Sequence, residues 1–280
     1  TASDVNKLRQ ATGAGMMDCK KALEESGGDF DKAIEILRKK GQKVAANRAD
    51  RESSEGVVLA KVNSDNTSGI IISLNCETDF VAKNDDYVQL AQRLSDHALG
   101  FTDKESFLDS DFEGMKVSEK LLEQTGIIGE KIEIGSFEHI SASFVGSYIH
   151  AGNKIASIVG FSENFDNAGD VGKDLSMQIA AMNPVAIDEN GVSQEVIAKE
   201  IEIAKDQLRQ EGKPEEMLDN IAKGKLKKFF KENTLINQQF IKDSKISILQ
   251  YIKGFSESVE VTDFSSCLLY TSPSPRDLST

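Results

Sequence analysis

The residue types that could support binding or catalysis are concentrated in the segment 75–84, which reads Asn-Cys-Glu-Thr-Asp-Phe-Val-Ala-Lys-Asn. Its centre places an acid, Asp79, beside an aromatic residue, Phe80, with Thr78 and Val81 on either side. An acid and an apolar residue at this position are typical of an ordinary helix cap and staple, which the residue chemistry alone favours. The alternative is an exposed acidic-aromatic tip that enters a pocket of a partner protein.

Signatures of nucleotide-binding and hydrolytic enzymes are absent from the sequence. There is no GxxxxGK[ST], GxSxG or HExxH motif. Gly13-Ala14-Gly15 lies between two expected helices and not after a strand, so a helix–helix turn is favoured over a phosphate cradle. His150 is isolated near the end of an expected strand, which favours a polar or interface role over that of a catalytic base. We therefore expect no enzymatic activity and no cofactor.

Composition and charge narrow the classes of partner. The 280 residues are 39% hydrophobic and 28% charged, and no apolar run approaches the ~18 residues of a membrane span. The net charge is −13, although residues 1–51 hold 11 basic and 8 acidic residues, a net +3. The remaining −16 argues against a nucleic-acid surface, and the basic run at 38–51 is best interpreted as a solvated face. We expect neither a membrane nor a nucleic-acid partner.

Cysteine and histidine usage favours a reducing compartment. Cys19, Cys76 and Cys267 form no CxxC pair and no even disulfide framework. With only three histidines in the chain, a metal site has little support. No signal peptide or Arg-rich leader precedes the first helix, so a cytoplasmic location is expected.

The N-terminal residues 3–38 predict three short helices. Ser3 is expected to cap the first, which shows Val5 and Leu8 on one side. The second begins at Met16-Met17, and Asp29 caps the third. A polar connector is expected at 39–55.

The centre of the chain predicts two hairpin-plus-helix units. A loop at 101–130 with one or two helices would join them, which indicates an α+β body of two lobes. The expected strands lie at 57–62, 70–76, 143–150 and 155–161, and the helices at 85–98 and 168–182, the latter stopped by Asn183-Pro184.

The C-terminal third predicts an inserted helical hairpin. Two narrow apolar seams within 194–230 are separated by Gly212-Lys213-Pro214, which is typical of two antiparallel helices. Packing on the body and contact with a partner are equally consistent with this pattern. A helix at 245–253 and a strand at 256–262 are expected next. The segment 265–280 shows no periodicity, and it is interpreted as foreign adapter sequence or a disordered tail.

Two long segments in order resemble the signatures of the elongation factor Ts family. They are residues 9–23, Arg-Gln-Ala-Thr-Gly-Ala-Gly-Met-Met-Asp-Cys-Lys-Lys-Ala-Leu, and the segment 75–84. Residues 146–150, 224–229 and 237–240 look like further family landmarks. The tripeptide Thr-Asp-Phe alone would be weak, because it recurs at 262–264. The resemblance covers about residues 3–264.

The resemblance implies a guanine-nucleotide exchange factor that binds elongation factor Tu and promotes GDP release during translation elongation. A ubiquitin-associated-like N-terminal module would dock on the GTPase through Val5, Leu8, Met16 and Met17. Thr78, Asp79, Phe80 and Val81 would enter near the magnesium and nucleotide site, and His150 would contact a more distant domain. The family's C-terminal helix is missing or replaced after Phe264. A homodimer through 194–230 is implied by some family members.

Two functions from other classes are alternatives to nucleotide exchange. The first is a passive ubiquitin-associated-type adaptor that acts through residues 3–38, and the second is an enzyme that uses His150.

The expected organisation divides the chain into seven parts. They are the docking module 1–38, the linker 39–55, core subdomain N 56–130, the two parts 131–193 and 231–264 of core subdomain C, the hairpin 194–230 and the tail 265–280.

Overall fold

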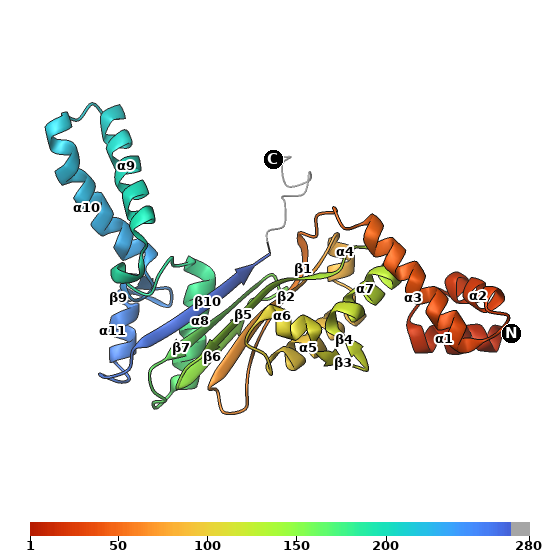
Figure 1. Ribbon diagram of the computed structural model, residues 1–280. Helices are drawn as coiled ribbons and strands as arrows, with labels where there is room; N and C mark the ends of the chain where they lie inside the picture. The colour runs from red at the N-terminus through yellow and green to blue at the C-terminus, as the bar shows by residue number, and fades with distance from the viewer. Residues whose placement is uncertain (270–280) are drawn as a thin grey trace.

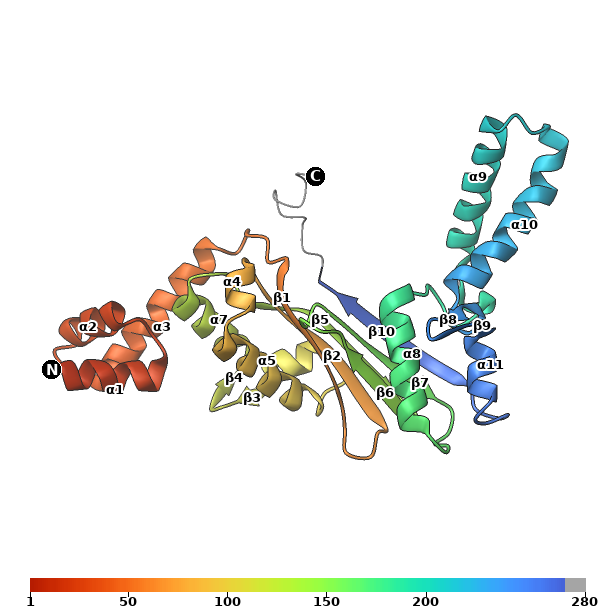
Figure 2. The same cartoon turned by 180° about the vertical axis from the view of Figure 1, so that it is seen from behind.

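The computed structural model describes residues 1–269 of the chain. Figures 1 and 2 show an elongated molecule, with three N-terminal helices at one end, a long helical hairpin at the other and strands between them. No helix in the described part of the chain is long and apolar enough to cross a membrane.

The N-terminal module consists of α1 (Ala2–Thr12), α2 (Met16–Glu25) and α3 (Phe30–Asn47). The expected cap at Ser3 is wrong by two residues, because Thr1 forms a capping box with Asp4. Gly13 ends α1 in the left-handed conformation, with φ at 70°. The Asp29 carboxylate accepts from the amide of Lys32 and so begins α3 where the sequence predicts.

Helix α3 is longer than expected. The connector predicted at 39–55 is helical as far as Asn47. Its second half packs on α7 (Val117–Ile128), where Gly41 and Gly126 lie backbone to backbone. A Cβ atom at Gly126 would overlap the Cα atom of Gly41. The predicted connector is therefore shortened to residues 48–54, and the module is also joined to the body by a helix crossing that requires glycine at Gly126.

Six strands form two antiparallel sheets of the same topology. The first has the order β1 (Glu55–Val62), β2 (Ser68–Cys76) and β5 (Glu133–Ser141). The second contains β6 (Phe144–Ile149), β7 (Ile155–Phe161) and β10 (Val261–Leu268), with β7 in the middle. In both sheets a hairpin is completed by a third strand that follows a long insertion. The predicted subdomain boundary at 130/131 is therefore misplaced, because β5 pairs with β2.

The two sheets pack face to face, and each outer face carries helices. Successive side chains of a strand point to opposite faces, so β1 and β2 supply two cores at once. The core between the sheets contains Val58, Ala60, Ile71, Val145 and Ile158. The outer cores contain Val57, Leu59, Ile70, Ile72 and Leu74 on one side, and Val159, Phe161, Val171, Leu175 and Ile179 on the other.

Different helices cover the two outer faces. The first sheet is covered by α4 (Asp79–Ala82), α5 (Asp85–Ala98), α6 (Lys104–Asp109) and α7, with the small hairpin β3 (Asp111–Phe112) and β4 (Met115–Lys116). The second is covered by α8 (Ala168–Met182) and α11 (Ile248–Lys253). Near this face lie η1 (Glu189–Gly191), η2 (Leu235–Asn237), β8 (Gln239–Phe240) and β9 (Asp243–Ser247).

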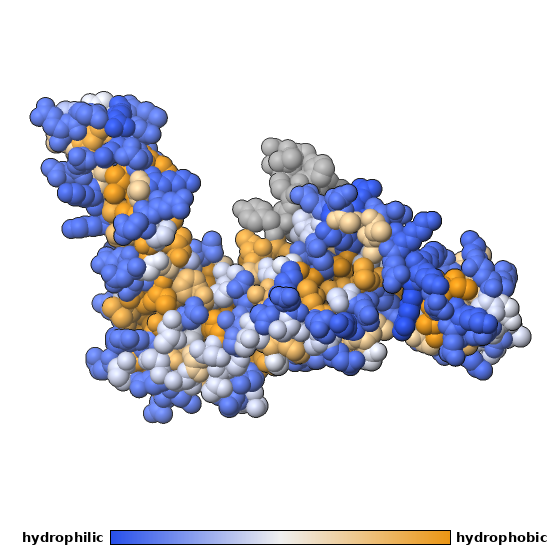
Figure 3. Space-filling model, viewed as in Figure 1, coloured by the Kyte–Doolittle hydropathy of each residue, from blue (hydrophilic) through white to orange (hydrophobic). Residues whose placement is uncertain are grey.

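Helices α9 (Gln194–Gln210) and α10 (Glu215–Asn233) run antiparallel and stand away from the sheets in both views (Figures 1 and 2). Ala204 and Leu208 of one helix and Leu218 and Ala222 of the other are buried between them. Figure 3 shows further apolar surface, in orange, along the hairpin and at its base. The hairpin therefore stabilises itself with a narrow seam, and most of its surface is solvated.

The predicted start of a foreign or disordered tail at 265 is too early. The strand expected at 256–262 instead spans Val261–Leu268, and Ser265, Ser266, Cys267 and Leu268 all pair with β7. Cys267 and Leu269 are buried between the two sheets. The period-2 pattern is weak because Ser265 and Ser266 are polar. The rest of the predicted tail, residues 270–280, lies outside the described residues.

Replacing Gly126 with alanine tests the crossing of α3 and α7. We expect Gly126→Ala to destabilise the protein by about 1–3 kcal/mol, because the added Cβ atom meets backbone that cannot move aside. Urea unfolding followed by circular dichroism measures the change. Gly224→Ala is the matched control, since nothing lies within 4 Å of its Cβ position in α10. It should stabilise by about 0.5–1 kcal/mol. Equal effects of the two variants would contradict the close crossing.

Candidate functional site

The Thr-Asp-Phe-Val segment is an exposed tip at the end of β2. The strand ends at Cys76, and Asp79 begins the single turn of α4 two residues before Val81. The Phe80 side chain is 83% exposed, the highest value among the large apolar residues that the structure leaves on the surface. An aromatic ring left in water on a rigid strand end is a ready anchor for a partner pocket.

The interpretation of Asp79 as a helix cap is wrong. Thr78 is the N-cap residue of α4 and makes no side-chain cap hydrogen bond, while Asp79 lies in the first turn. The Asp79 carboxylate instead accepts from the Lys83 ammonium at 2.6 Å. This hydrogen bond lowers the pKa of Asp79. The acid therefore carries a negative charge directly beside the exposed ring.

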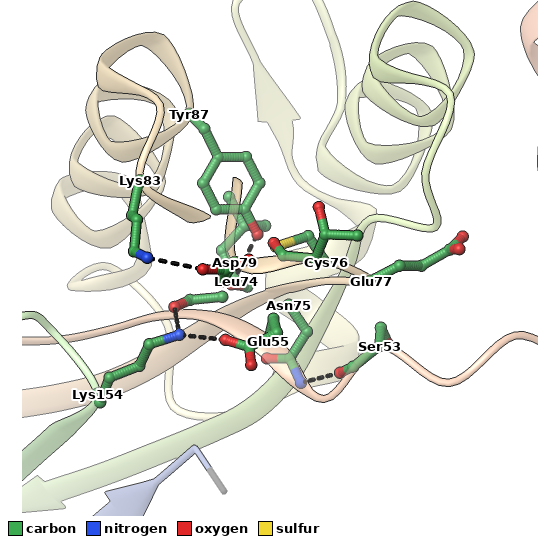
Figure 4. A network of polar contacts seen from close by, with 12 residues as sticks. Ser53, Glu55, Leu74, Asn75, Cys76, Glu77, Asp79, Lys83, Tyr87 and Lys154 are labelled. Atoms are coloured by element: carbon green, nitrogen blue, oxygen red, sulfur yellow. Dashed lines mark hydrogen bonds and ion pairs between the residues drawn. The ribbon is translucent and has the colours of Figure 1, made fainter. Parts of the chain in front are cut away.

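Buried polar contacts fix the strand that carries the tip (Figure 4). The Tyr87 hydroxyl of α5 donates to the Leu74 carbonyl at 2.8 Å, and burial raises the pKa of Tyr87. The Cys76 thiol donates to the Thr78 carbonyl at 3.2 Å. Burial also raises the pKa of Cys76 to about 11. Both groups are therefore neutral donors near pH 7, as these hydrogen bonds require.

Glu77 connects the tip to the helix of the N-terminal module. The Arg48 guanidinium, at the end of α3, reaches both carboxylate oxygens of Glu77 at 2.8 Å. The Lys131 amide donates to the same carboxylate at 2.7 Å. Burial raises the pKa of Glu77, but the Lys131 and Arg48 hydrogen bonds outweigh burial and lower it overall. The carboxylate remains charged and holds two segments that are distant in sequence.

A groove of about 730 Å³ lies beside the tip, between α4, α5 and α7. Its lining combines apolar side chains with charged groups. They are Phe80, Val81, Leu90, Ile127 and Ile128, with Asp86, Arg93, Lys120 and Glu130. The exposed ring thus borders a concave surface, which gives a partner element both a protrusion and a hollow to contact.

The turn between β6 and β7 lies next to the same end of the first sheet. The Val58 amide donates to the Asn153 carbonyl at 2.7 Å, and the Lys154 ammonium contacts Glu55 at 2.6 Å. Figure 4 shows Lys154 and Glu55 below the tip. His150, at the start of this turn, is exposed, and its Nδ1 atom lies 2.9 Å from the Tyr148 hydroxyl. Among residues 1–269, no carboxylate forms a hydrogen bond or ion pair with this imidazole.

The predicted docking residues of the N-terminal module do not all reach its surface. Met16 and Met17 are 54% and 62% exposed, and with the half-buried Val5 they line a hollow of about 750 Å³. Leu8 is wrong as a contact residue, because it is completely buried in the module core. Leu8 lies on the same side of α1 as Val5, as its helical spacing predicts, but this side of α1 faces α2 and α3.

Several residues of this site have no sequence signal. Arg48, Glu130 and Lys154 act through partners that lie 29, 52 and 99 residues away in the chain. Their types are common on protein surfaces, so no local pattern separates them from solvated charges. In the described residues no group of three His, Cys, Asp or Glu side chains could hold a metal ion.

Cys76 should resist alkylation in the folded protein. With a pKa of about 11, only on the order of one thiol in a thousand is ionised at pH 8. We expect iodoacetamide to label Cys76 on the order of a hundredfold more slowly in buffer than in urea. Peptide mass spectrometry assigns the labelled residue, and Cys19 and Cys267, which are also buried, serve as internal comparisons. Equal rates in buffer and urea would contradict the buried hydrogen-bonded thiol.

The family model that matches this chain and three of its relatives carry the same description. The model of the family "Elongation factor TS" matches residues 77–268, which reaches the end of β10 and passes the boundary expected at 264. Elongation factor Ts of Christiangramia forsetii is 63% identical over 269 residues, covering 96% of this chain and 98% of that protein. The Flavobacterium psychrophilum protein of that name is 60% identical with the same coverage, and that of Porphyromonas gingivalis 46% identical over 94% and 96%. With this similarity along nearly its whole length, the chain belongs to the elongation factor Ts family.

Proposed function

We propose that this protein is a guanine-nucleotide exchange factor that binds elongation factor Tu and promotes release of its GDP. The observation that carries the proposal is the exposed Phe80 ring beside the charged Asp79, held on a fixed strand end. Membership of the elongation factor Ts family supports the choice of partner and reaction. The protein would act by binding alone, without a cofactor and without forming covalent bonds.

The tip formed by Thr78, Asp79, Phe80 and Val81 is proposed to enter the GTPase near its magnesium and nucleotide site. Insertion would bury the apolar ring, while the adjacent carboxylate would disturb charges arranged to hold a phosphate and a cation. A partner that binds better to the distorted site must weaken GDP, and GDP must weaken the partner by the same factor. The proposed tip thereby converts binding free energy into nucleotide release.

The magnitude of the effect requires more than one contact. An acceleration of 10³- to 10⁴-fold would need about 4–5.5 kcal/mol from the release barrier. Burying one Phe side chain contributes about 1.5–3 kcal/mol. We therefore extend the proposed interface to Val5, Met16 and Met17 of the module and to His150 beside the second sheet.

The remaining parts of the proposal concern location and assembly. A cytoplasmic location is consistent with a translation factor whose three cysteines are buried and unpaired in the structure. Self-association through α9 and α10 is also proposed, since Ile203 and Met217 leave apolar side chains on the outer surface of the hairpin.

Phe80→Ala tests the tip directly. We expect release of a fluorescent GDP analogue from bacterial elongation factor Tu, at fixed subsaturating factor, to slow about 10- to 100-fold relative to the unmodified chain, because one buried aromatic contact is lost. Stopped-flow fluorescence measures the rate. Phe255→Ala is the matched control, since this exposed Phe lies beside α11, far from the tip.

The outcome also separates the rival functions. If the unmodified chain bound the GTPase without changing GDP release, a passive adaptor would replace the exchange factor. If the chain catalysed a reaction in the absence of any GTPase, and His150→Ala abolished that activity, an enzymatic function would replace the exchange function.

Replacing both Met16 and Met17 with alanine tests the module surface. We expect affinity for nucleotide-free elongation factor Tu to fall about tenfold or more, because two half-exposed apolar side chains would be removed from the contact. Isothermal titration calorimetry measures the dissociation constant. Met182→Ala at the end of α8 provides an exposed methionine as control. Unchanged affinity in the double variant would remove the module surface from the proposed interface.

A further inference from the structure

The residues before the tip and those after α7 hold each other by exchanged carboxylate–backbone hydrogen bonds. Glu130 Oε2 accepts from the amides of Glu77 and Thr78 at 3.1 and 3.0 Å. Glu130 Oε1 accepts from the Thr78 hydroxyl at 2.6 Å. In return, the Glu77 carboxylate accepts from the Lys131 amide. One carboxylate therefore accepts three hydrogen bonds from the two residues that precede Asp79.

We propose that Glu130 is the positioning residue of the tip, and that it holds Asp79 and Phe80 in the orientation required for exchange. This inference rests on the proposed function. Glu130 itself lies in the wall of the groove beside the ring, half-buried behind the tip. It would act through Thr78 and the backbone and not on the nucleotide.

The tip cannot hold its own conformation. Helix α4 has four residues, and isolated helices of that length are unstable in water. Thr78, its N-cap, makes no side-chain cap bond within the helix, and its hydroxyl donates to Glu130. The Asp79–Lys83 pair spans the turn but is solvent-exposed, and exposed ion pairs contribute little. At the end of α4 Ala82 is buried in the core, and at its start the Cys76 thiol donates to the Thr78 carbonyl. The amides of Glu77 and Thr78 and the Thr78 hydroxyl are held by Glu130.

Glu130 is itself placed by rigid structure. Gly129 ends α7 in the left-handed conformation with φ at 80°, which turns the chain toward the tip. The Ile132 amide then donates to the buried Thr125 hydroxyl at 3.1 Å, so the turn is tied back to α7. Because α7 also crosses α3 at Gly126, the docking module and the tip are built on the same helix.

A fixed ring binds better than a mobile one. Ordering a flexible side chain or loop at an interface consumes binding free energy, and preorganisation removes that loss. Removing Glu130 would leave two amides and a hydroxyl without their acceptor. Water can replace the acceptor at this half-buried site, so we expect the fold to survive while the tip becomes mobile.

The first measurement does not involve the GTPase. The chain contains no tryptophan, so Phe80→Trp creates a single fluorescent reporter at the tip. Time-resolved anisotropy should show a larger fast-motion amplitude when Glu130→Ala is added. Glu138→Ala, which removes an exposed carboxylate from β5, should leave the decay unchanged. Identical decays in the Glu130 and Glu138 variants would overturn the positioning role.

The second measurement is a double-mutant cycle on GDP release. We expect Glu130→Ala to slow release on the order of tenfold, but less than about twofold when Phe80 is already alanine, because coupled residues are non-additive. Additive losses would overturn the inference. Glu130→Gln keeps one acceptor oxygen and should give an intermediate rate, which also provides a test if the alanine variant does not fold.

The two measurements separate this inference from the proposed function. If Phe80→Ala did not slow release, the exchange role of the tip would fail, and the anisotropy comparison would still decide whether Glu130 positions it. If Phe80→Ala slowed release while Glu130→Ala changed neither rate nor anisotropy, the proposed function would stand and the positioning role would fall.

Discussion

The packing of the two three-stranded sheets against each other is the constraint on which the rest of the structure depends. It buries Val58, Ile71, Val145 and Ile158 in a core that neither sheet could form alone. Gly69 permits the approach, because a Cβ atom there would meet the Val145 side chain within 2.7 Å. The shared core fixes the two lobes relative to each other. It therefore fixes the end of β2, which carries the tip, relative to the turn that carries His150.

Polar contacts transmit this rigidity to the surface that is proposed to bind the partner. Tyr87, Cys76 and Glu77 hold the end of β2 from behind, so Phe80 is exposed on a segment with little freedom. Arg48 ties the same strand end to α3. The exposed apolar groups of the module and the tip are thus parts of one framework, although they lie more than sixty residues apart in the chain.

The sequence predicted elements well where start and stop signals are local. The helix at 85–98 is capped by Asn84 through two amide hydrogen bonds, and the helix at 168–182 ends at Asn183 before a proline. Both have the predicted bounds. The predictions failed where tertiary contact decides. Helix α3 continues through polar residues because Gly41 meets α7, and Leu8 is buried because two further helices cover its side of α1.

The order of the strands along the chain has a consequence for the course of folding. The first sheet is complete once residue 141 has been synthesised, whereas β7 pairs with β10 only after residue 268. Contacts between such distant segments form slowly. During synthesis, the second lobe would expose an unpaired edge of β7 and the apolar inner face that Cys267 and Leu269 later cover. Such an edge can pair with other chains. By pairing with β7, the last strand of the structure therefore also protects the protein against aggregation. The hairpin α9–α10 lies between β7 and β10 in the sequence, so it must be synthesised before β10 can pair.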